Sequence, residues 1–471
     1  MPLSPDYRPS SAHAALGPEF YDLVEAASFP QTILRFRNQS AAERIGLGEL
    51  TDAEWIDHFG RFTPLPGTFE TPLALRYHGH QFRSYNPDIG DGRGFLFAQM
   101  EDDSGRLLDL ATKGSGTTPW SRSGDGRLTL KGGVREVLAT EMLEALGVDT
   151  SKSFSLIETG EALHRGDEPS PTRSAVLVRL SHSHIRIGTF QRLRYLDKSD
   201  EIPRLIDHSI HHYLPEVKAG GEPARTLAFL DAVSRRLAKT TAAWMVAGFV
   251  HGVLNTDNIN ITGESFDYGP WRFLPKLDPA FTAAYFDQTG LYAFGRQPDT
   301  LFWNLTRLAE CLLDFAPQPE IETILRAFPP LVQEEFRIAL LRRLGVASAG
   351  LDADNVLVAS AWRFLALSEM PFEQFFFGWF GGLRSGRATP SGDAYAGEHF
   401  DTFRTALEPF APRPEIDFGH PYFQRTAPCT MLIDEVEALW EPIAERDDWQ
   451  AFDAKIANIR EMGAALRLQP G

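Results

Sequence analysis

The chain has 471 residues, of which 43% are hydrophobic, and its formal net charge is -17. This length allows a large core, in either about two to four ordinary domains or one large two-lobed unit. The negative charge disfavours nucleic acids and anionic membranes as partners, although it does not forbid a local basic cleft. The longest aromatic run, at residues 375–380, is far too short to span a bilayer, so we expect it to pack in the core.

The N-terminal sequence and the cysteines bear on the cellular compartment. Residues 1–10 lack the basic and apolar regions of a secretory signal, so we expect a cytoplasmic protein. The two cysteines, Cys311 and Cys429, are too few for a disulfide framework and fit a reducing compartment. We expect both to be core thiols, although sequence alone sets no distance that would exclude a bond between them.

Several histidines have the spacing of metal ligands. They are His78 and His80, His182 and His184, and the group His208, His211 and His212. No cysteine or carboxylate cluster in the sequence completes any of these sets, so we expect structural or solvent-facing roles for them.

The order of predicted elements indicates an α+β protein in three parts. Residues 1–60 are predicted to form an N-terminal extension with short helices, and residues 61–190 a strand-rich part. Residues 191–471 are predicted to be mainly helical, because apolar residues recur there at helical spacing, as they do over 230–244. Period-two patterns predict strands within the middle part at residues 94–100, 108–113, 154–158 and 174–180.

A lysine and a glutamate in the middle part suggest a phosphate-binding pair. Lys113 ends a predicted strand on the face opposite Leu108 and Leu110, and Glu136 lies on a helix predicted to begin near Gly133. Taken singly, each charged residue is more often a solvated surface group. In kinases, however, a strand lysine contacts the phosphates and a helix glutamate orients it. Because the order along the chain is the same, we expect Lys113 and Glu136 to pair.

Residues 251–258, HGVLNTDN, and residues 267–269, DYG, correspond to two kinase motifs. A protein kinase has HRDLxxxN, in which the aspartate is the base, followed by DFG, and the asparagine and second aspartate hold metal. The base position here is Val253, which cannot accept a proton. Either the chain is an inactive kinase relative or another group takes the proton. Asp257 is the candidate, because its carboxylate lies beside Asn258.

Two glycine-rich tetrapeptides and two arginines are candidates for binding phosphate. Gly-Asp-Gly-Arg occurs at 90–93 and at 124–127, and neither copy matches a P-loop or the kinase glycine loop. Their glycines would let backbone amides approach an anion, although at either site taken alone a tight Asp-Gly turn between strands is the favoured explanation. Arg179 and Arg186 could neutralise a triphosphate, or they could be ordinary surface residues.

Together these residues resemble the selenoprotein O family, pseudokinases that act as protein adenylyltransferases. The matching motifs lie between about residues 76 and 300, and the C-terminal third offers little to match. They include HGHQF at 78–82, both Gly-Asp-Gly-Arg segments, SHIR at 183–186, and the two kinase-like motifs, the second extended to DYGP. The resemblance implies a kinase-like two-lobed fold with an N-terminal extension and a mainly helical C-terminal lobe.

The resemblance also implies an activity and a set of site residues. The activity is transfer of AMP from ATP to Ser, Thr or Tyr hydroxyls of proteins, with ATP bound in a flipped orientation. Asp257 would accept the proton, Glu136 would orient Lys113, and Asn258 and Asp267 would hold Mg²⁺, with Mn²⁺ as an alternative. The nucleotide site would comprise Gly90, Gly92, Arg93, Lys113, Asp125, Gly126, Arg179, Arg186 and Asp267.

One family feature is missing. Many members carry a cysteine or selenocysteine near the C-terminus, and in some bacterial relatives it forms a regulatory disulfide with a cysteine in the loop after the catalytic motifs. This chain ends in Leu468-Gln-Pro-Gly471, and its matching loop, residues 277–284, contains no cysteine. We therefore expect no redox control of that type.

Two other functions stay open. The first is a small-molecule or protein phosphotransferase with a relocated base, against which Val253 argues. The second is a catalytically silent ATP-binding scaffold, against which the joint presence of the lysine, glutamate, asparagine and metal aspartate argues. The sequence does not identify protein substrates, the choice between ATP and UTP, or the oligomeric state.

Overall fold

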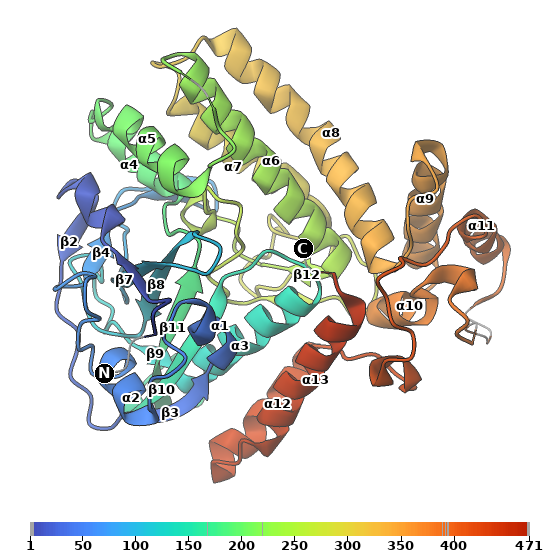
Figure 1. Cartoon of the computed structure of the whole chain (residues 1–471), viewed down its shortest axis with the longest axis horizontal. Helices are drawn as coiled ribbons and strands as arrows, with labels where there is room; N and C mark the ends of the chain where they lie inside the picture. The colour runs from blue at the N-terminus through green and yellow to red at the C-terminus, as the bar shows by residue number, and fades with distance from the viewer. Residues whose placement is uncertain are drawn as a thin grey trace.

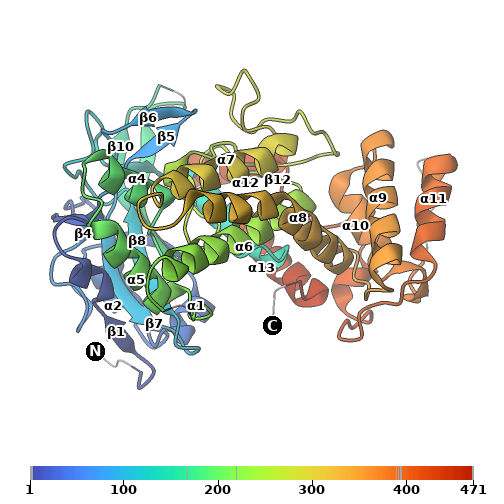
Figure 2. The ribbon, with the colours of Figure 1, turned by 90° about the horizontal axis from the view of Figure 1, so that it is seen from above.

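The computed structural model describes residues 4–166, 168–218, 220–388, 390, 392 and 395–468. Within them the chain is a mixed α+β protein with an antiparallel sheet and many helices. The sheet lies at one end of the molecule, and helices α9 (Leu351–Leu367) and α11 (Glu398–Leu407) lie at the other (Figures 1 and 2). None of the described helices is long and apolar enough to cross a membrane.

The sheet has nine strands in the described residues, and its main path runs β2-β4-β7-β8-β11-β10-β3. The four strands predicted from period-two patterns are confirmed as β7, β8, β10 and β11, which occupy its centre. The strands are β1 (Arg8–Ser10), β2 (Tyr21–Leu23), β3 (Ile33–Arg37), β4 (Leu73–Leu75), β7 (Leu96–Glu101), β8 (Leu107–Lys113), β9 (Leu128–Thr129), β10 (Lys152–Leu163) and β11 (Thr172–Ser181).

The first 60 residues contain the expected short helices, α1 (Gln39–Arg44) and α2 (Asp52–Phe59), but they also contribute three strands to the sheet. Strand β3 pairs with β10, and β1 pairs with β7. The predicted extension of short helices was therefore incomplete. Strand β3 pairs with the backbone N–H and C=O groups of β10, which would otherwise form an open edge of the sheet. The part boundaries at residues 60 and 190 stay predictions.

Helix α3 (Leu130–Ala145) carries Glu136 and begins earlier than the predicted start near Gly133. The side chain of Thr129 accepts a hydrogen bond from the backbone N–H of Gly132, which caps the first turn. A Cβ added at Gly133 would lie 2.4 Å from Leu156 Cδ1, so this glycine lets the helix pack closely on the sheet. Close packing places Glu136 beside the end of β8.

The helical part begins with α4 (Ile187–Tyr195) and is built around α6 (Ala224–Ala247), which confirms the helix predicted over residues 230–244. Helices α6 and α8 lie side by side (Figure 1), and α13 returns to pack on α3. An ion pair between Arg460 Nη2 and Glu141 Oε1, at 2.6 Å, ties α13 to α3. The remaining helices are α5 (Glu201–Tyr213), α6 (Ala224–Ala247), α7 (Gln297–Glu310), α8 (Gln318–Arg343), α9 (Leu351–Leu367), α10 (Phe372–Trp379), α11 (Glu398–Leu407), α12 (Ile433–Arg446) and α13 (Gln450–Leu466).

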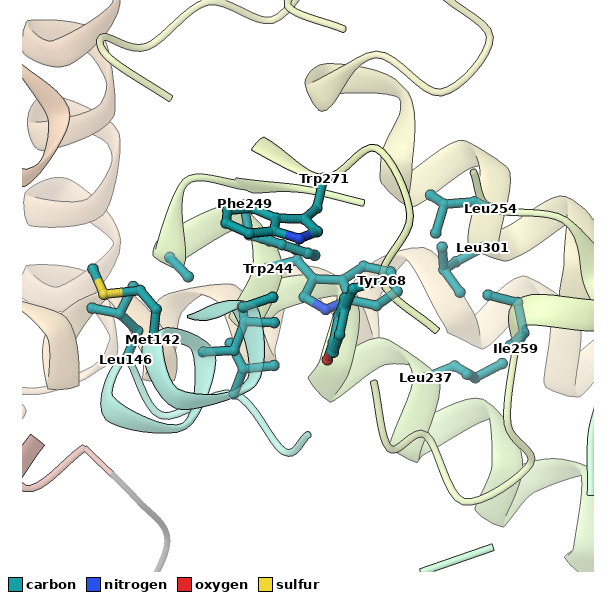
Figure 3. Close-up of a cluster of buried hydrophobic side chains, with 14 of the residues drawn as sticks. Met142, Leu146, Leu237, Trp244, Phe249, Leu254, Ile259, Tyr268, Trp271 and Leu301 are labelled. Atoms are coloured by element: carbon teal, nitrogen blue, oxygen red, sulfur yellow. The ribbon is translucent and has the colours of Figure 1, made fainter. Parts of the chain in front are cut away.

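A buried aromatic cluster joins α3 and α6 to the DYG loop (Figure 3). Trp244 of α6, Phe249, Tyr268 and Trp271 belong to this cluster, in which the Phe249 ring packs against Tyr268, which is 2% exposed. The Tyr268 hydroxyl donates to Ser265 Oγ at 2.8 Å, so its polar group is satisfied inside the cluster. This packing fixes the backbone immediately after Asp267.

The predictions for the aromatic run and the cysteines are confirmed. Phe375 and Phe376 on α10 are fully buried in a second core cluster. Cys311 and Cys429 are buried free thiols, and burial raises the pKa of Cys311 to about 12, which disfavours its thiolate form at neutral pH. Residues 469–471, where the family cysteine would be sought, lie outside the described part of the chain.

The candidate metal-ligand histidines contact protein groups. His78 Nδ1 lies 2.8 Å from the Tyr85 hydroxyl, and His184 Nδ1 lies 3.1 Å from Asp109 Oδ2. The His208 ring packs against the ring of His212. Across the described residues, no group of three or more His, Cys, Asp or Glu side chains is arranged to hold a metal ion.

Candidate active site

A cavity of about 630 Å³ lies between the sheet and the loop that carries Asp257 and Asp267. Its volume is in the range of small-ligand sites. The structure brings most of the predicted site residues together in its wall: Gly90, Gly92, Arg93, Lys113, Asp125, Gly126, Arg179, Arg186, Asp257 and Asp267. Glu136 and Asn258 are not among the lining residues, although each lies next to one that is.

Lys113 is the last residue of β8 and points toward α3. Its ammonium pairs with Glu136, so the predicted lysine–glutamate pair is confirmed, and Nζ also donates to Asp267 Oδ1 at 2.9 Å. The lysine is 6% exposed. A buried ammonium between two carboxylates has a fixed position, which suits a group that must meet a phosphate.

Asp267 is the centre of charge in the site. Its backbone φ of +65° lies in the left-handed region, which costs a non-glycine residue free energy and is typical of functional positions. Burial alone would raise the pKa of Asp267, but the charges of Lys113, Arg179 and Arg186 outweigh burial and hold the pKa well below its usual range. The carboxylate is therefore ionised near neutral pH.

The two arginines predicted from the sequence are both buried beside Asp267. Arg179 Nη1 donates to Asp267 Oδ1 at 3.1 Å. The Arg186 guanidinium lies over the Tyr77 ring at 4.2 Å and is 3.5 Å from Asp91 Oδ1. Within the described residues, Nε of each arginine is buried without a hydrogen-bond partner. Buried cations with unused donors suit an anionic ligand such as a nucleotide phosphate.

Asp257 lies in the short helical turn η2 (Thr256–Asn258) and is 8% exposed. Burial raises its pKa to about 6. Within the described residues, Asp257 Oδ1 is buried without a hydrogen-bond partner, while Oδ2 accepts from Gln81 Nε2 at 3.4 Å. A carboxylate with a near-neutral pKa and an unused oxygen is suited to accept a proton.

A divalent cation fits the residues at this end of the cavity. Asp267 supplies an ionised carboxylate, and Asn258 donates from Nδ2 to the Val253 carbonyl at 3.0 Å, a bond that does not use its own carbonyl oxygen. Mg²⁺ is usually held by one or two such oxygen ligands together with substrate phosphates and water. The expected ligand pair therefore suits Mg²⁺ bound with a nucleotide.

The two Gly-Asp-Gly-Arg segments differ in their surroundings. In the first, a Cβ added at Gly90 would lie 2.6 Å from Trp120 Cγ, so the glycine admits the indole. In the second, Asp125 forms a bidentate pair with Arg165, and Arg127 Nε donates to Glu161 Oε2 at 2.9 Å. The charges of the second segment thus also hold its own loop in place.

Several cavity residues were missed by sequence reasoning, namely Tyr77, Gln81, Asp91, Trp120 and Arg165. Gln81 belongs to the HGHQF motif that supports the family resemblance, and Asp91 to the first Gly-Asp-Gly-Arg segment. No local pattern indicated a role for either side chain, because their partners lie far away in the sequence. Trp120 and Arg165 carried no signal that separates them from ordinary surface residues.

Comparison with known families decides the classification. A family described as protein adenylyltransferase SelO matches residues 3–460. The chain belongs to the SelO family. The resemblance expected from the motifs is therefore confirmed, and the match extends through the C-terminal third, where the motifs offered little.

The sequences of individual relatives align with this SelO family member over nearly the whole chain. The protein nucleotidyltransferase YdiU of Gloeobacter violaceus is 45% identical over 470 residues, which cover 98% of this chain and 96% of that protein. The protein of the same name from Synechocystis is 43% identical over 480 residues, which cover 97% and 98%. The prediction of an enzyme of the nucleotidyltransferase class is confirmed.

Gly79→Ala is expected to lower the rate of nucleotide transfer by this SelO family member about tenfold or more. The new Cβ would lie 2.6 Å from Asp257 Oδ1 and 3.0 Å from Asp257 Cβ, so the carboxylate must move. Steady-state transfer rates of the variant and the wild type, at matched folded fraction, measure the effect. Gly221→Ala is the control, because among the described residues no heavy atom beyond its two chain neighbours lies within 4 Å of its added Cβ. Equal rates for Gly79→Ala and wild type would contradict a catalytic position for Asp257.

Proposed function

We propose that this protein transfers AMP from ATP to Ser, Thr or Tyr hydroxyls of protein substrates, with Mg²⁺ as the metal. One observation carries the proposal: the Asp257 carboxyl, whose pKa is raised by burial, shares a cavity with the buried cations Lys113, Arg179 and Arg186, while valine occupies the kinase base position. The cavity therefore has groups for a polyphosphate and for an acceptor hydroxyl. The family name supports the choice of adenylyl transfer.

In the proposed reaction the acceptor hydroxyl oxygen bonds to the α-phosphorus of ATP, and the bond from that phosphorus to the bridging oxygen breaks. The hydroxyl proton passes to Asp257, and pyrophosphate leaves with the bond electrons. Lys113, Arg179 and Arg186 stabilise the negative charge that develops on the leaving group. Bound Mg²⁺, held by Asn258 and Asp267, would supply further neutralisation of phosphate charge.

The proposal includes the orientation in which ATP is bound. We propose that ATP is flipped relative to its orientation in kinases, so that the terminal phosphate lies deep among the buried cations and the α-phosphate faces the acceptor. We also propose a two-lobed kinase-like arrangement, in which the sheet and α3 supply Lys113 and Glu136 and the helical part supplies the loop of Asp257 and Asp267. The buried Lys113–Asp267 ion pair supports this arrangement, because the pair joins the two parts at the cavity.

We also propose a cytoplasmic location, which fits the low number of cysteines.

Transfer of label from ATP tests the proposal directly. The protein and a cell extract are incubated with Mg²⁺ and ATP labelled at the α-phosphate, in parallel with ATP labelled at the γ-phosphate. We expect α-label on protein and no γ-label. Label from the γ-phosphate alone would identify a kinase with an unusual base, and binding of ATP without transfer of either label would identify a silent scaffold. Either result would overturn adenylyl transfer.

A further inference from the structure

A hairpin far away in the sequence holds the loop that carries Asp257. Strands β5 (Gly79–Gln81) and β6 (Ser84–Asn86) form this hairpin. The backbone N–H of His80 donates to Thr256 Oγ1 at 2.7 Å, and that of Phe82 donates to Asn255 Oδ1 at 3.1 Å. The residues on either side of Gln81 thus bind the two residues that precede Asp257. The hairpin and the loop are held as one unit.

Gln81 sits at the middle of this contact, with its amide directed at the carboxylate. Its Nε2 donates to Asp257 Oδ2 at 3.4 Å, and it is the one side chain among the described residues that donates a hydrogen bond to Asp257. This distance lies at the long end of the hydrogen-bond range, so the contact orients the carboxylate more than it neutralises it. The other oxygen, Oδ1, lies against Gly79 without a hydrogen-bond partner in the described residues.

A second amide sets the orientation of Gln81. Asn86 Nδ2 donates to Gln81 Oε1 at 3.0 Å across the hairpin. This bond uses the carbonyl end of the Gln81 amide and leaves the NH₂ end for Asp257. The opposite orientation would place two oxygens against each other and two NH₂ groups against each other, which is unfavourable on both sides.

We propose that Gln81 is a positioning residue for Asp257, oriented by Asn86. The proposal rests on the proposed function, because it gives Gln81 a role in the step in which Asp257 accepts the proton. The Gln81 amide fixes the orientation of the Asp257 carboxylate plane, so that this carboxylate does not rotate away from the acceptor hydroxyl. Gly79 leaves the room that this orientation requires.

The first test is a double-mutant cycle in the transfer assay. Gln81→Met keeps the shape of the side chain but removes the donor, and we expect kcat to fall about 10–100-fold with KM for ATP little changed. In the Asp257→Asn background the same substitution is expected to change kcat less than about twofold. Equal losses in both backgrounds, or a loss confined to KM, would overturn the proposal. The cycle is read from whichever phosphate label the wild type transfers, so the nature of the reaction is decided separately.

Two further variants test the role of Asn86 and provide a control for the cycle. Asn86→Asp replaces the NH₂ donor by an acceptor that repels Gln81 Oε1, so we expect a loss of kcat similar to that of Gln81→Met. Gln318→Met is the control, since Gln318 Nε2 also donates to a carboxylate, Glu322 Oε1 at 2.9 Å, on an exposed face of α8. Wild-type kcat in Asn86→Asp would contradict the role of Asn86.

A spectroscopic test does not depend on catalysis. In protein labelled with ¹⁵N-glutamine, the side-chain amide signal that disappears in Gln81→Met identifies Gln81. We expect this signal to shift in Asp257→Asn and to stay unchanged in Asp447→Asn, whose carboxylate lies elsewhere and pairs with Arg35 and Arg173. An unchanged Gln81 signal in Asp257→Asn would overturn the contact, whatever the transfer assay shows.

Discussion

Asp267→Asn is expected to lower kcat/KM for nucleotide transfer by at least about 10³-fold. The substitution removes the ionised ligand proposed for Mg²⁺ and the shared partner of Lys113 and Arg179, so metal and phosphates would both be misplaced. Transfer of labelled nucleotide at saturating and at limiting ATP measures the loss. Thermal unfolding is measured in parallel, because removing one partner from a buried ion pair typically costs about 3–5 kcal/mol.

Asp447→Asn is a closely matched control for this substitution. Asp447 also has a left-handed backbone, with φ of +54°, and also pairs with two cations, Arg35 at 2.9 Å and Arg173 at 2.6 Å. It lies at the end of α12 and does not line the cavity. We expect Asp447→Asn to keep wild-type activity. A folded Asp267→Asn protein with more than about a tenth of wild-type kcat/KM would remove Asp267 from the proposed site.

Asp257→Asn is expected to lower kcat about 10²–10⁴-fold, the range for loss of a general base. Affinity for ATP should change little, because the proposed role of Asp257 lies in the proton transfer and not in binding the nucleotide. The measurements are the rate of a single turnover and the binding of ATP by calorimetry. Asp88→Asn is the control, since Asp88 is exposed and follows the same hairpin.

Stability gives a second signature for Asp257. Burial raises the pKa of Asp257 to about 6, above the unfolded value of 3.8, so the folded state disfavours the charged form. The uncharged asparagine should therefore leave the unfolding temperature at pH 7.5 unchanged or slightly higher. Loss of activity together with a clear loss of stability would instead indicate a structural role for Asp257.

The central strands and helix α6 could be predicted because their signals are local. Alternation over a few residues identified β7, β8, β10 and β11, and helical spacing identified α6. The order of the lysine, the glutamate and the two loop motifs along the chain predicted the Lys113–Glu136 pair. The position of Asp257 beside Asn258, with Val253 at the base position, suggested Asp257 as the replacement base, a role that stays a prediction.

The pairing of short strands in the sheet, and the pairing of single side chains, could not be predicted from the sequence and became visible only in the tertiary structure. Strands β1 and β3 are short, and their place in the sheet depends on β7 and β10, which lie far along the chain. The return of α13 to α3 and the pairing of Arg127 with Glu161 had no local signal either.

The sequence by itself therefore determined the family, the central strands and many, but not all, of the residues that line the cavity. Only the tertiary structure decided that Asp267 adopts a left-handed backbone between Lys113 and Arg179, and that Gln81 faces Asp257. The physical reason is the range of the interactions. Periodicity acts over a few residues, and motif order is written along the chain, whereas a hydrogen bond between Gln81 and Asp257 forms only when a hairpin and a loop separated by 176 positions are packed together.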